Sequence, residues 1–258
     1  MRTARSEAGW VYLVGAGPGE RGLLTLKAKD LLETCNCVLY DHLGTKDIVS
    51  FAPSSAERIC VGKVGHGCQV AQAEIHRLLV DRARRGRRVV RLKGGCPTVF
   101  GRLAEELAVL RAAGVPCEVV PGVSSALSVP AAAGIIVTHR EIASSVAIVA
   151  GHCATEGKQP LRRVAHADTI VILMGARRLR TLTEELLSAG RAAATPAAFI
   201  SEGASPRQRT VIATLATLAR EVEREGLGAP AVIVVGEVVG VSPPLALAEL
   251  AFAAASDN

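Results

Sequence analysis

The sequence predicts an α/β protein made of two α/β domains, and three observations support this. The chain has 258 residues, of which 49% are hydrophobic and 21% charged, so it can bury one large or two modest cores and is not intrinsically disordered. Short apolar runs alternate with segments of helical spacing, which is typical of βαβ units. A Gly-, Pro- and Ala-rich stretch between about 121 and 138 interrupts the series. We therefore predict an N-terminal domain over 1–122 and a C-terminal domain over 123–258.

The apolar runs of the first domain predict its strands, and the leucine spacing between 23 and 32 predicts its first helix. Two further helices are expected at about 69–85 and 102–112. Because strands and helices alternate, we expect parallel βαβ units. The strands are expected at 11–14, 37–40, 58–61, 88–92 and 117–120.

The second domain repeats this kind of pattern, with helices expected near 177–188 and 214–225. A cleft between two such domains is a usual place for a ligand. Its strands are expected at 146–149, 169–173, 197–200, 209–213 and 231–235.

Composition argues against several classes of protein. Aromatic residues are only 3%, so an aromatic platform for single-stranded nucleic acid is not expected. No apolar run reaches the ~18 residues that a membrane span needs. The seven cysteines are scattered without a CxxC motif, and no histidine pair has metal-binding spacing. We expect a soluble, cytoplasmic protein without a metal, a disulfide scaffold or a membrane partner.

Positive charge is concentrated in one segment. The net charge is +6, and residues 58–111 carry twelve Lys and Arg against four Asp and Glu. A polyanion-binding surface is one interpretation, and a solvated Arg-rich helix face is the other. We favour the solvated face for the run from Arg82 to Arg88. A basic nucleic-acid-binding module, the alternative from another functional class, is disfavoured because the charge is confined and lacks aromatic neighbours.

Two glycine-rich loops follow predicted strands, at 15–19 and 94–101. The first is not a dinucleotide fingerprint, because Glu20 replaces the required glycine and Pro18 has no backbone N–H. It also lacks the GK[ST] of a P-loop. Glycine lets the backbone approach a ligand closely, and two such loops in one domain exceed what turns alone require. The second loop by itself fits an ordinary βα connection as well as it fits a ligand site.

Two charged residues stand at strand ends, Asp41 in the run Tyr40-Asp41 and Lys63 in the run VGK. Either can serve as a proton-handling group. Taken singly, each is more often a cap or a solvated charge.

These residues form part of an ordered set of motifs that resembles the tetrapyrrole methylase family, and within it the members that methylate uroporphyrinogen III. The resemblance covers roughly residues 10–240. Its motifs are VYLVGAGPG (11–19), LLTLKA (23–28), VLYDHL (38–43), VGK (61–63), VVRLKGGCPTVFGR (89–102), AAGVPCEVVPGVSSA (112–126), PAAAGIIVTHR (130–140), GH (151–152), DTIVILMGA (168–176), TPAAFI (195–200), QRTV (208–211) and PAVIVVGEVV (230–239).

The resemblance implies two α/β domains that bind S-adenosylmethionine in the interdomain cleft, and a homodimer. The implied reaction is C-methylation of uroporphyrinogen III at carbons 2 and 7 to give precorrin-2, for sirohaem and cobalamin, with S-adenosylhomocysteine as the other product and no metal. We expect the chain to act without an added dehydrogenase or synthase domain. The alternative is a methyltransferase for a later corrin intermediate or another divergent substrate, which Tyr40-Asp41 argues against.

Site residues are implied in the same way. The resemblance assigns catalytic roles to Asp41, Lys63 and Arg102, and Arg102 is expected to clamp carboxylates before acting as a base. Glu105 and Arg140 are implied at the carboxylate-rich tetrapyrrole, which the basic segment containing Lys63, Lys93 and Arg102 would attract. The implied cofactor-binding residues are Pro18, Gly94, Gly95, Cys96, Val99, Ser124, Ser125, Met174 and Gly203.

One loop departs from the family pattern. Where the family usually has GGDPFVFGR, this chain has Cys96 in place of the Asp and Thr98 in place of the Phe. A thiol is a weaker hydrogen-bonding group than a carboxylate that could accept from a ribose hydroxyl.

Overall fold

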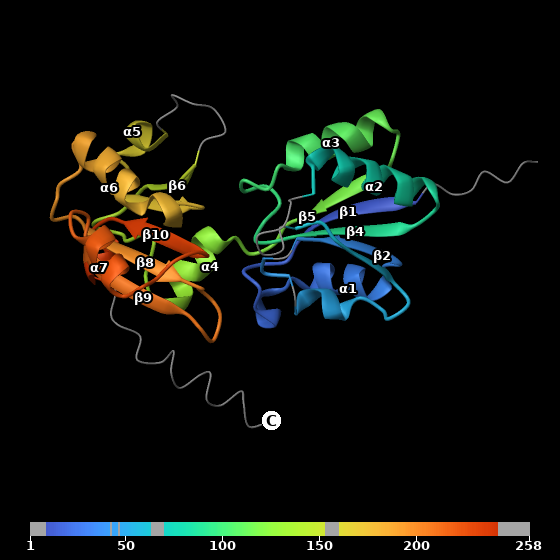
Figure 1. Ribbon diagram of the computed structural model, residues 1–258, viewed down its shortest axis with the longest axis horizontal. Helices are drawn as coiled ribbons and strands as arrows, with labels where there is room; N and C mark the ends of the chain where they lie inside the picture. Colours follow the sequence, from blue (N-terminus) through green and yellow to red (C-terminus); the bar gives the residue numbers. More distant parts are fainter. Residues whose placement is uncertain (1–8, 42, 46, 63–69, 153–159, 242–258) are drawn as a thin grey trace, which may run out of the picture. The chain divides into compact units, whose positions relative to one another are not determined.

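The computed structural model describes residues 9–41, 43–45, 47–62, 70–152 and 160–241. The chain divides into two compact units, Met1–Ser124 and Ser125–Asn258, each with its own five-stranded sheet (Figure 1). The predicted α/β class is therefore confirmed.

The first unit is built on a parallel sheet with the strand order β3-β2-β4-β1-β5. Every predicted strand of this domain is present within a residue or two. Its strands are β1 (Trp10–Gly15), β2 (Cys37–Tyr40), β3 (Glu57–Cys60), β4 (Arg88–Lys93) and β5 (Cys117–Val120).

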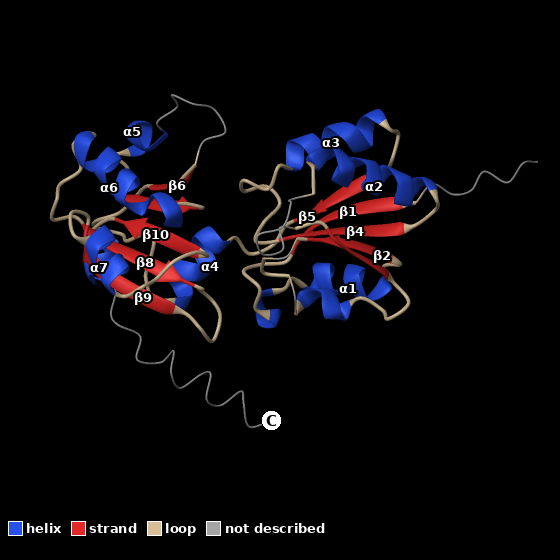
Figure 2. Cartoon of the chain, viewed as in Figure 1, coloured by secondary structure: helices blue, strands red, loops and turns tan. Residues whose placement is uncertain are grey.

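Helices cover both faces of this sheet, as Figure 2 shows. Helix α1 (Leu26–Thr34) packs on one face, and α2 (Gln72–Arg84) and α3 (Leu103–Ala112) pack on the other. The Thr25 hydroxyl starts α1 by accepting a hydrogen bond from the Ala28 N–H (3.2 Å). Because strand side chains alternate, Val90 of β4 faces α1 while Val89 faces α2 and α3.

The second unit contains a mixed sheet with the order β6-β7-β10-β8-β9. Only β6 and β7 pair in parallel, and the other neighbours are antiparallel. Its strands are β6 (Val146–Ala150), β7 (Thr169–Leu173), β8 (Pro196–Ser201), β9 (Arg209–Thr214) and β10 (Ala231–Val235).

The second sheet is also covered on both faces. Helices α5 (Pro160–Val164), α6 (Leu179–Ser188) and α7 (Leu218–Arg224) pack on one face, and α4 (Ser125–Ala132) and α8 (Val238–Val241) on the other. Within the described residues, no helix is both long and apolar enough to cross a bilayer. The chain also has short 3-10 helices at Arg21–Leu23, Ile48–Phe51 and Ala176–Arg178.

Candidate active site

The two predicted glycine loops meet at the carboxyl edge of the first sheet. The Gly17 N–H donates to the Gly95 carbonyl (3.2 Å), and the Gly95 N–H donates back to the Gly17 carbonyl (2.7 Å). A third loop joins them, because a Cβ on Gly122 would lie only 2.4 Å from the Gly95 oxygen. A Cβ on Gly15 would lie 2.5 Å from the Gly122 nitrogen. Only glycine permits this close approach of three backbones.

The loop after β2 packs against the same group. A Cβ on Gly19 would lie 3.1 Å from the Gly44 Cα, and one on Gly94 would lie 3.0 Å from the Leu43 carbonyl oxygen. The ends of β1, β2, β4 and β5 are thus in one place, at the edge where open α/β sheets bind ligands. We call this group of loops, residues 15–19, 43–45, 94–98 and 121–122, the loop cluster.

Cys96 lies in the loop cluster, half-buried, with its Sγ 3.0 Å from the Thr98 Oγ1. Burial by itself raises the pKa of the Cys96 thiol, but hydrogen bonds from the Thr98 side chain and from the Thr98 and Gly122 backbones outweigh it and lower the pKa overall. The two residues of this loop that depart from the family pattern are therefore partners of each other. They form a polar site with acceptor character where the family pattern has a carboxylate.

Asp41 follows β2 directly and lies beside β4. Its N–H donates to the Leu92 carbonyl (3.2 Å), and the Thr45 hydroxyl donates to the Asp41 carbonyl oxygen. Its Oδ1 accepts a hydrogen bond from Arg91 Nη2 at 2.6 Å. The Asp41 side chain is 33% exposed, so one end of this ion pair reaches the surface while Arg91 is buried. This places a carboxylate at the edge of the loop cluster.

Behind Asp41 is a buried ionic network that the sequence analysis missed. Glu106 of α3 is completely buried, and its Oε1 accepts from Arg91 Nε (3.2 Å), Lys93 Nζ (2.8 Å) and Gln72 Nε2 (3.4 Å). We call Asp41, Arg91, Lys93 and Glu106 the buried ion network. A signal for it existed, because Arg91 and Lys93 alternate with apolar residues inside a central strand.

The structure corrects the role that we expected of Lys93. It does not add to an exposed basic surface, because its side chain is 6% exposed and is bound to Glu106. Burial, and the charge of nearby Arg91, lower the pKa of Lys93, although Glu106 acts in the opposite direction.

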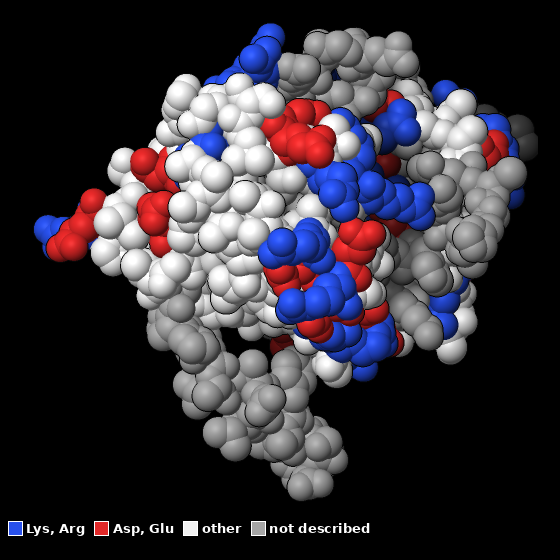
Figure 3. Space-filling view, turned by 60° about the vertical axis from the view of Figure 1, so that its left-hand side comes forward, with Lys and Arg blue, Asp and Glu red and all other residues white. Residues whose placement is uncertain are grey.

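The Arg-rich run is mostly solvated, as we favoured, but it is not one helix face, because α2 ends at Arg84 and Arg88 begins β4. Residues 84, 85, 87 and 88 are exposed, and Arg85 pairs with Asp81. Arg82 is more covered and binds Glu57 in addition to Asp81. On the face shown in Figure 3, Lys and Arg side chains likewise lie among Asp and Glu side chains.

Arg102 and Glu105, both expected at the substrate, form an ion pair with each other. Arg102 Nε donates to Glu105 Oε1 (2.9 Å) and Nη2 to Oε2 (2.5 Å), and both side chains are about half exposed. The hydrogen bond to Glu105 raises the pKa of Arg102, and the reverse interaction lowers the pKa of Glu105. Arg102 adopts a left-handed backbone conformation (φ 54°) at the start of α3, which is uncommon for a residue with a side chain.

The predicted residues of the second unit are at turns and at a helix start. Met174 follows β7, is 49% exposed and has a left-handed φ of 56°. Gly203 packs against α4, since a Cβ there would lie 2.2 Å from a Val129 methyl carbon. Ser125 begins α4, and Arg140 is exposed. Lys63 lies outside the described residues, so its predicted catalytic role stays a prediction.

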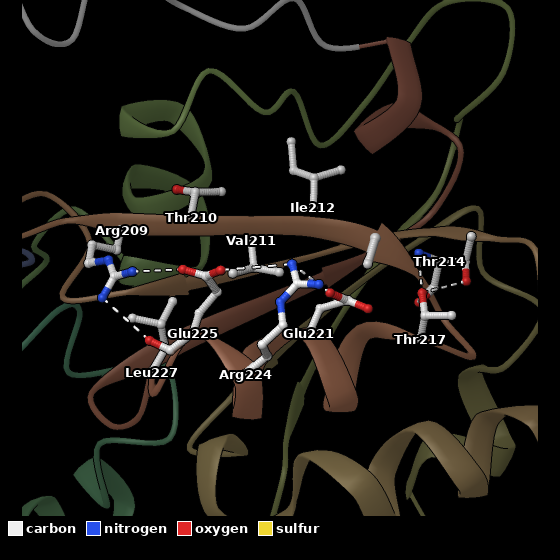
Figure 4. A pocket seen from close by; sticks show the side chains of 11 residues that line it. Arg209, Thr210, Val211, Ile212, Thr214, Thr217, Glu221, Arg224, Glu225 and Leu227 are labelled. Atoms are coloured by element: carbon white, nitrogen blue, oxygen red, sulfur yellow. Dashed lines mark hydrogen bonds and ion pairs between the residues drawn. The ribbon is translucent and has the colours of Figure 1, made fainter.

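The second unit also has a surface hollow between β9 and α7 (Figure 4). Its charged side chains pair among themselves, with Arg209 bound to Glu225 (2.9 Å) and Arg224 to Glu221 (2.9 Å). None of the predicted site residues lines it. Across the described part of the chain, no three His, Cys, Asp or Glu side chains are grouped as a metal ion would require.

Comparison with known proteins gives the family. The sequence profile described as "Tetrapyrrole (Corrin/Porphyrin) Methylases" matches residues 10–219. The chain belongs to the tetrapyrrole methylase family.

A solved structure with a similar fold is that of the "Uroporphyrin-III C-methyl transferase" of Thermus thermophilus complexed with "S-adenyl homocysteine". It is 44% identical, with a TM-score of 0.79, over 90% of this chain and all of that one.

Relatives of two lengths match. The "S-adenosyl-L-methionine-dependent uroporphyrinogen III methyltransferase" of Methanosarcina barkeri is 46% identical over 90% of this chain and 92% of its own length. The "Siroheme synthase 2" of Aeromonas hydrophila is 45% identical over 94% of this chain, but the match covers 52% of that protein. The chain thus spans about half the length of the siroheme synthases that it matches.

Proposed function

We propose that this protein is an S-adenosylmethionine-dependent methyltransferase that methylates uroporphyrinogen III at carbons 2 and 7 to give precorrin-2. The observation that supports this best is the loop cluster with Asp41 at its edge, in a chain 44% to 46% identical to relatives named for this activity over nearly their whole length. The family match alone would fit a methyltransferase for a later corrin intermediate equally well.

The loop cluster suits a nucleoside cofactor. Gly94 is exposed and carries no side chain, so its backbone is open to a ligand. Cys96, with its lowered pKa, can accept a hydrogen bond from a ribose hydroxyl. We assign the cofactor to Pro18, Gly94, Gly95, Cys96 and Val99, and by resemblance also to Ser124, Ser125, Met174 and Gly203.

S-adenosylmethionine, when bound, supplies an electrophilic methyl group on its sulfonium. The pyrrole carbon of the substrate is itself the nucleophile, so the protein must align the substrate and take up a proton. Asp41 is the candidate base in the described chain, because Arg91 holds its Oδ1 while Oδ2 makes no hydrogen bond within the described residues. Lys63 is the second proposed proton-handling group.

The substrate carboxylates require cationic partners. We assign Arg102 and Arg140 to them, and both side chains are well exposed. Arg102 donates from Nε and Nη2 to the two carboxylate oxygens of Glu105. Binding of a substrate carboxylate by the same nitrogens would therefore replace Glu105 as the partner of Arg102. We therefore propose that Glu105 holds the Arg102 side chain in place until the substrate binds.

Mass spectrometry of the product tests the proposed reaction. The purified protein would be incubated anaerobically with uroporphyrinogen III and methyl-labelled S-adenosylmethionine. We expect a tetrapyrrole that carries two labelled methyl groups, with S-adenosylhomocysteine released in a twofold molar amount. Unlabelled uroporphyrinogen III at the end of the incubation, together with labelling of a later corrin intermediate offered in parallel, would favour the alternative function.

Two further parts of the proposal are a homodimer and a cytoplasmic location. Cytoplasmic location is supported by the thiols, since Cys35, Cys37, Cys60, Cys96 and Cys117 are all free, as is usual in a reducing compartment. Light scattering after size-exclusion chromatography tests the dimer, and a mass of about 27 kDa instead of about twice that value would contradict it.

A further inference from the structure

We propose that Arg91 and Glu106 are positioning residues for the reaction, and that they act through Asp41. Glu106 holds Arg91, and Arg91 in turn fixes one oxygen of the Asp41 carboxylate. The inference rests on the proposed function, which gives Asp41 the role of base.

The fold brings these side chains to one face of the first sheet. Cys37 and Leu39 of β2 face α2 and α3. Asp41 is two residues after Leu39, so its side chain lies on the same side of the sheet. Along β4, Val89 faces the same helices, so Arg91 and Lys93 do too. Glu106 lies on the face of α3 that covers them.

The planar guanidinium of Arg91 is held by three hydrogen bonds, one from each of its nitrogens. Nε donates to Glu106 Oε1 (3.2 Å), Nη1 to the Leu92 carbonyl (3.1 Å) and Nη2 to Asp41 Oδ1 (2.6 Å). These bonds fix the rotation of the group, so the place of Asp41 Oδ1 is determined by Glu106 and by the β4 backbone. A lysine could reach one of these partners but could not hold all three in a plane.

A purely structural role explains this arrangement poorly. Glu106 is fully buried and Arg91 is 3% exposed, and taking such ions out of water is expensive compared with packing apolar residues. Apolar side chains such as Leu79 and Leu110 pack on the same face of the sheet. The network is also directional, since only its Asp41 end reaches the surface.

A positioning role predicts a specific kinetic effect. Displacing a reacting group by about 1 Å can lower the rate by about 10²-fold. Loss of Arg91 or Glu106 should therefore lower kcat, while KM for uroporphyrinogen III and the affinity for S-adenosylhomocysteine stay within about threefold of wild type, because neither residue is assigned to substrate or cofactor.

A double-mutant cycle tests the inference. Arg91→Lys and Glu106→Gln would each be made in the wild-type and in the Asp41→Asn background. As single variants, we expect each to lower kcat about 10- to 100-fold. In the Asp41→Asn background, each should lower kcat by no more than about twofold further, because the group that they position no longer functions. Glu57→Gln, which breaks the ion pair with Arg82 in the same unit, is the matched control and should keep wild-type kcat.

The inference would be overturned if the kcat of each double variant fell by the product of the two single-variant factors. It would also be overturned if Arg91→Lys and Glu106→Gln both kept wild-type kcat while Asp41→Asn lowered it. Wild-type kcat in Asp41→Asn would overturn the role of Asp41 and this inference with it. If Glu106→Gln does not fold, Lys93→Met/Glu106→Gln removes one buried charge of each sign, and the same result is expected of that pair.

Discussion

The first unit contains two groups of arginine–carboxylate pairs that look alike in the sequence and differ in the structure. Arg82 binds Glu57 and Asp81 near the C-terminal end of α2, whereas Arg91 of the central strand β4 binds Asp41 and Glu106. Every side chain of the first group keeps part of its surface in water, from 18% for Arg82 to 37% for Glu57, so its geometry does not need to be precise. In the second group Arg91 and Glu106 are shielded from water and only Asp41 is partly exposed, so the geometry is fixed and its loss is costly. The two groups contain the same residue types, so burial is what distinguishes a surface ion pair from a buried one beside the candidate active site.

Removing Glu106 should have the largest effect on stability. Glu106→Ala leaves Arg91 and Lys93 buried without their shared carboxylate, which we expect to lower the free energy of unfolding by about 3 to 5 kcal/mol. Glu57→Ala should lower it by about 1 kcal/mol or less, since this pair is partly exposed. Urea unfolding of both variants measures the difference. Equal losses would show that burial does not distinguish the two groups.

The glycines of the loop cluster should come next. Gly122→Ala would place a Cβ 2.4 Å from the Gly95 oxygen, and we expect a loss of about 1 to 3 kcal/mol in stability, with weaker binding of S-adenosylhomocysteine. Gly228→Ala is the matched control, because a Cβ there meets nothing within 4 Å. Thermal unfolding and calorimetric titration check both properties. A Gly122→Ala protein as stable as the control would mean that the three loops can separate.

Lys93 should give the stability of the protein an alkaline pH dependence. Burial holds the pKa of native Lys93 below its usual 10.5, so in the window between the lowered pKa and 10.5 the unfolded chain binds a proton that the native protein has lost. The free energy of unfolding should therefore rise with pH in that window, by up to about 1.4 kcal/mol per pH unit. Lys93→Met should lack this rise. Identical pH profiles for the variant and the wild type would contradict the lowered pKa.

Cys96 should show the smallest effect. Cys96→Asp restores the acceptor of the family pattern, next to the Thr98 hydroxyl and the backbones of Thr98 and Gly122. A hydrogen bond from a ribose hydroxyl to a carboxylate contributes about 1.5 to 3 kcal/mol, and desolvation offsets part of it. We expect a gain of about tenfold in S-adenosylhomocysteine affinity by calorimetry. Unchanged or weaker binding would mean that the site has adapted to the thiol.

Sequence reasoning found the strands more easily than their pairing. The ten strands of the described residues follow from short apolar runs, but the mixed directions of the second sheet do not, because a strand pattern carries no information on direction. Helix α4 was missed because its exposed positions, such as Leu127, are as apolar as its buried ones, and because Pro130 lies inside it. Such a helix has no polar face to mark its period.

The site was predictable where it rests on motifs and unpredictable where it rests on burial. The glycines at 15–19 and 94–95 indicated a ligand loop, and the structure shows why they must be glycine. Counting charge by segment treated Arg91 and Lys93 like the exposed arginines nearby. Only the packing of α3 over β4 reveals that Arg91 and Lys93 share the buried carboxylate of Glu106.

The most direct test of the account compares Asp41→Asn with Glu57→Gln in the methyl-transfer assay. We predict that Asp41→Asn lowers kcat by about a hundredfold while binding S-adenosylhomocysteine as the wild type does, and that Glu57→Gln leaves both properties within about twofold. Wild-type turnover in Asp41→Asn would contradict the central claim, that the buried ion network serves a carboxylate that takes part in the reaction.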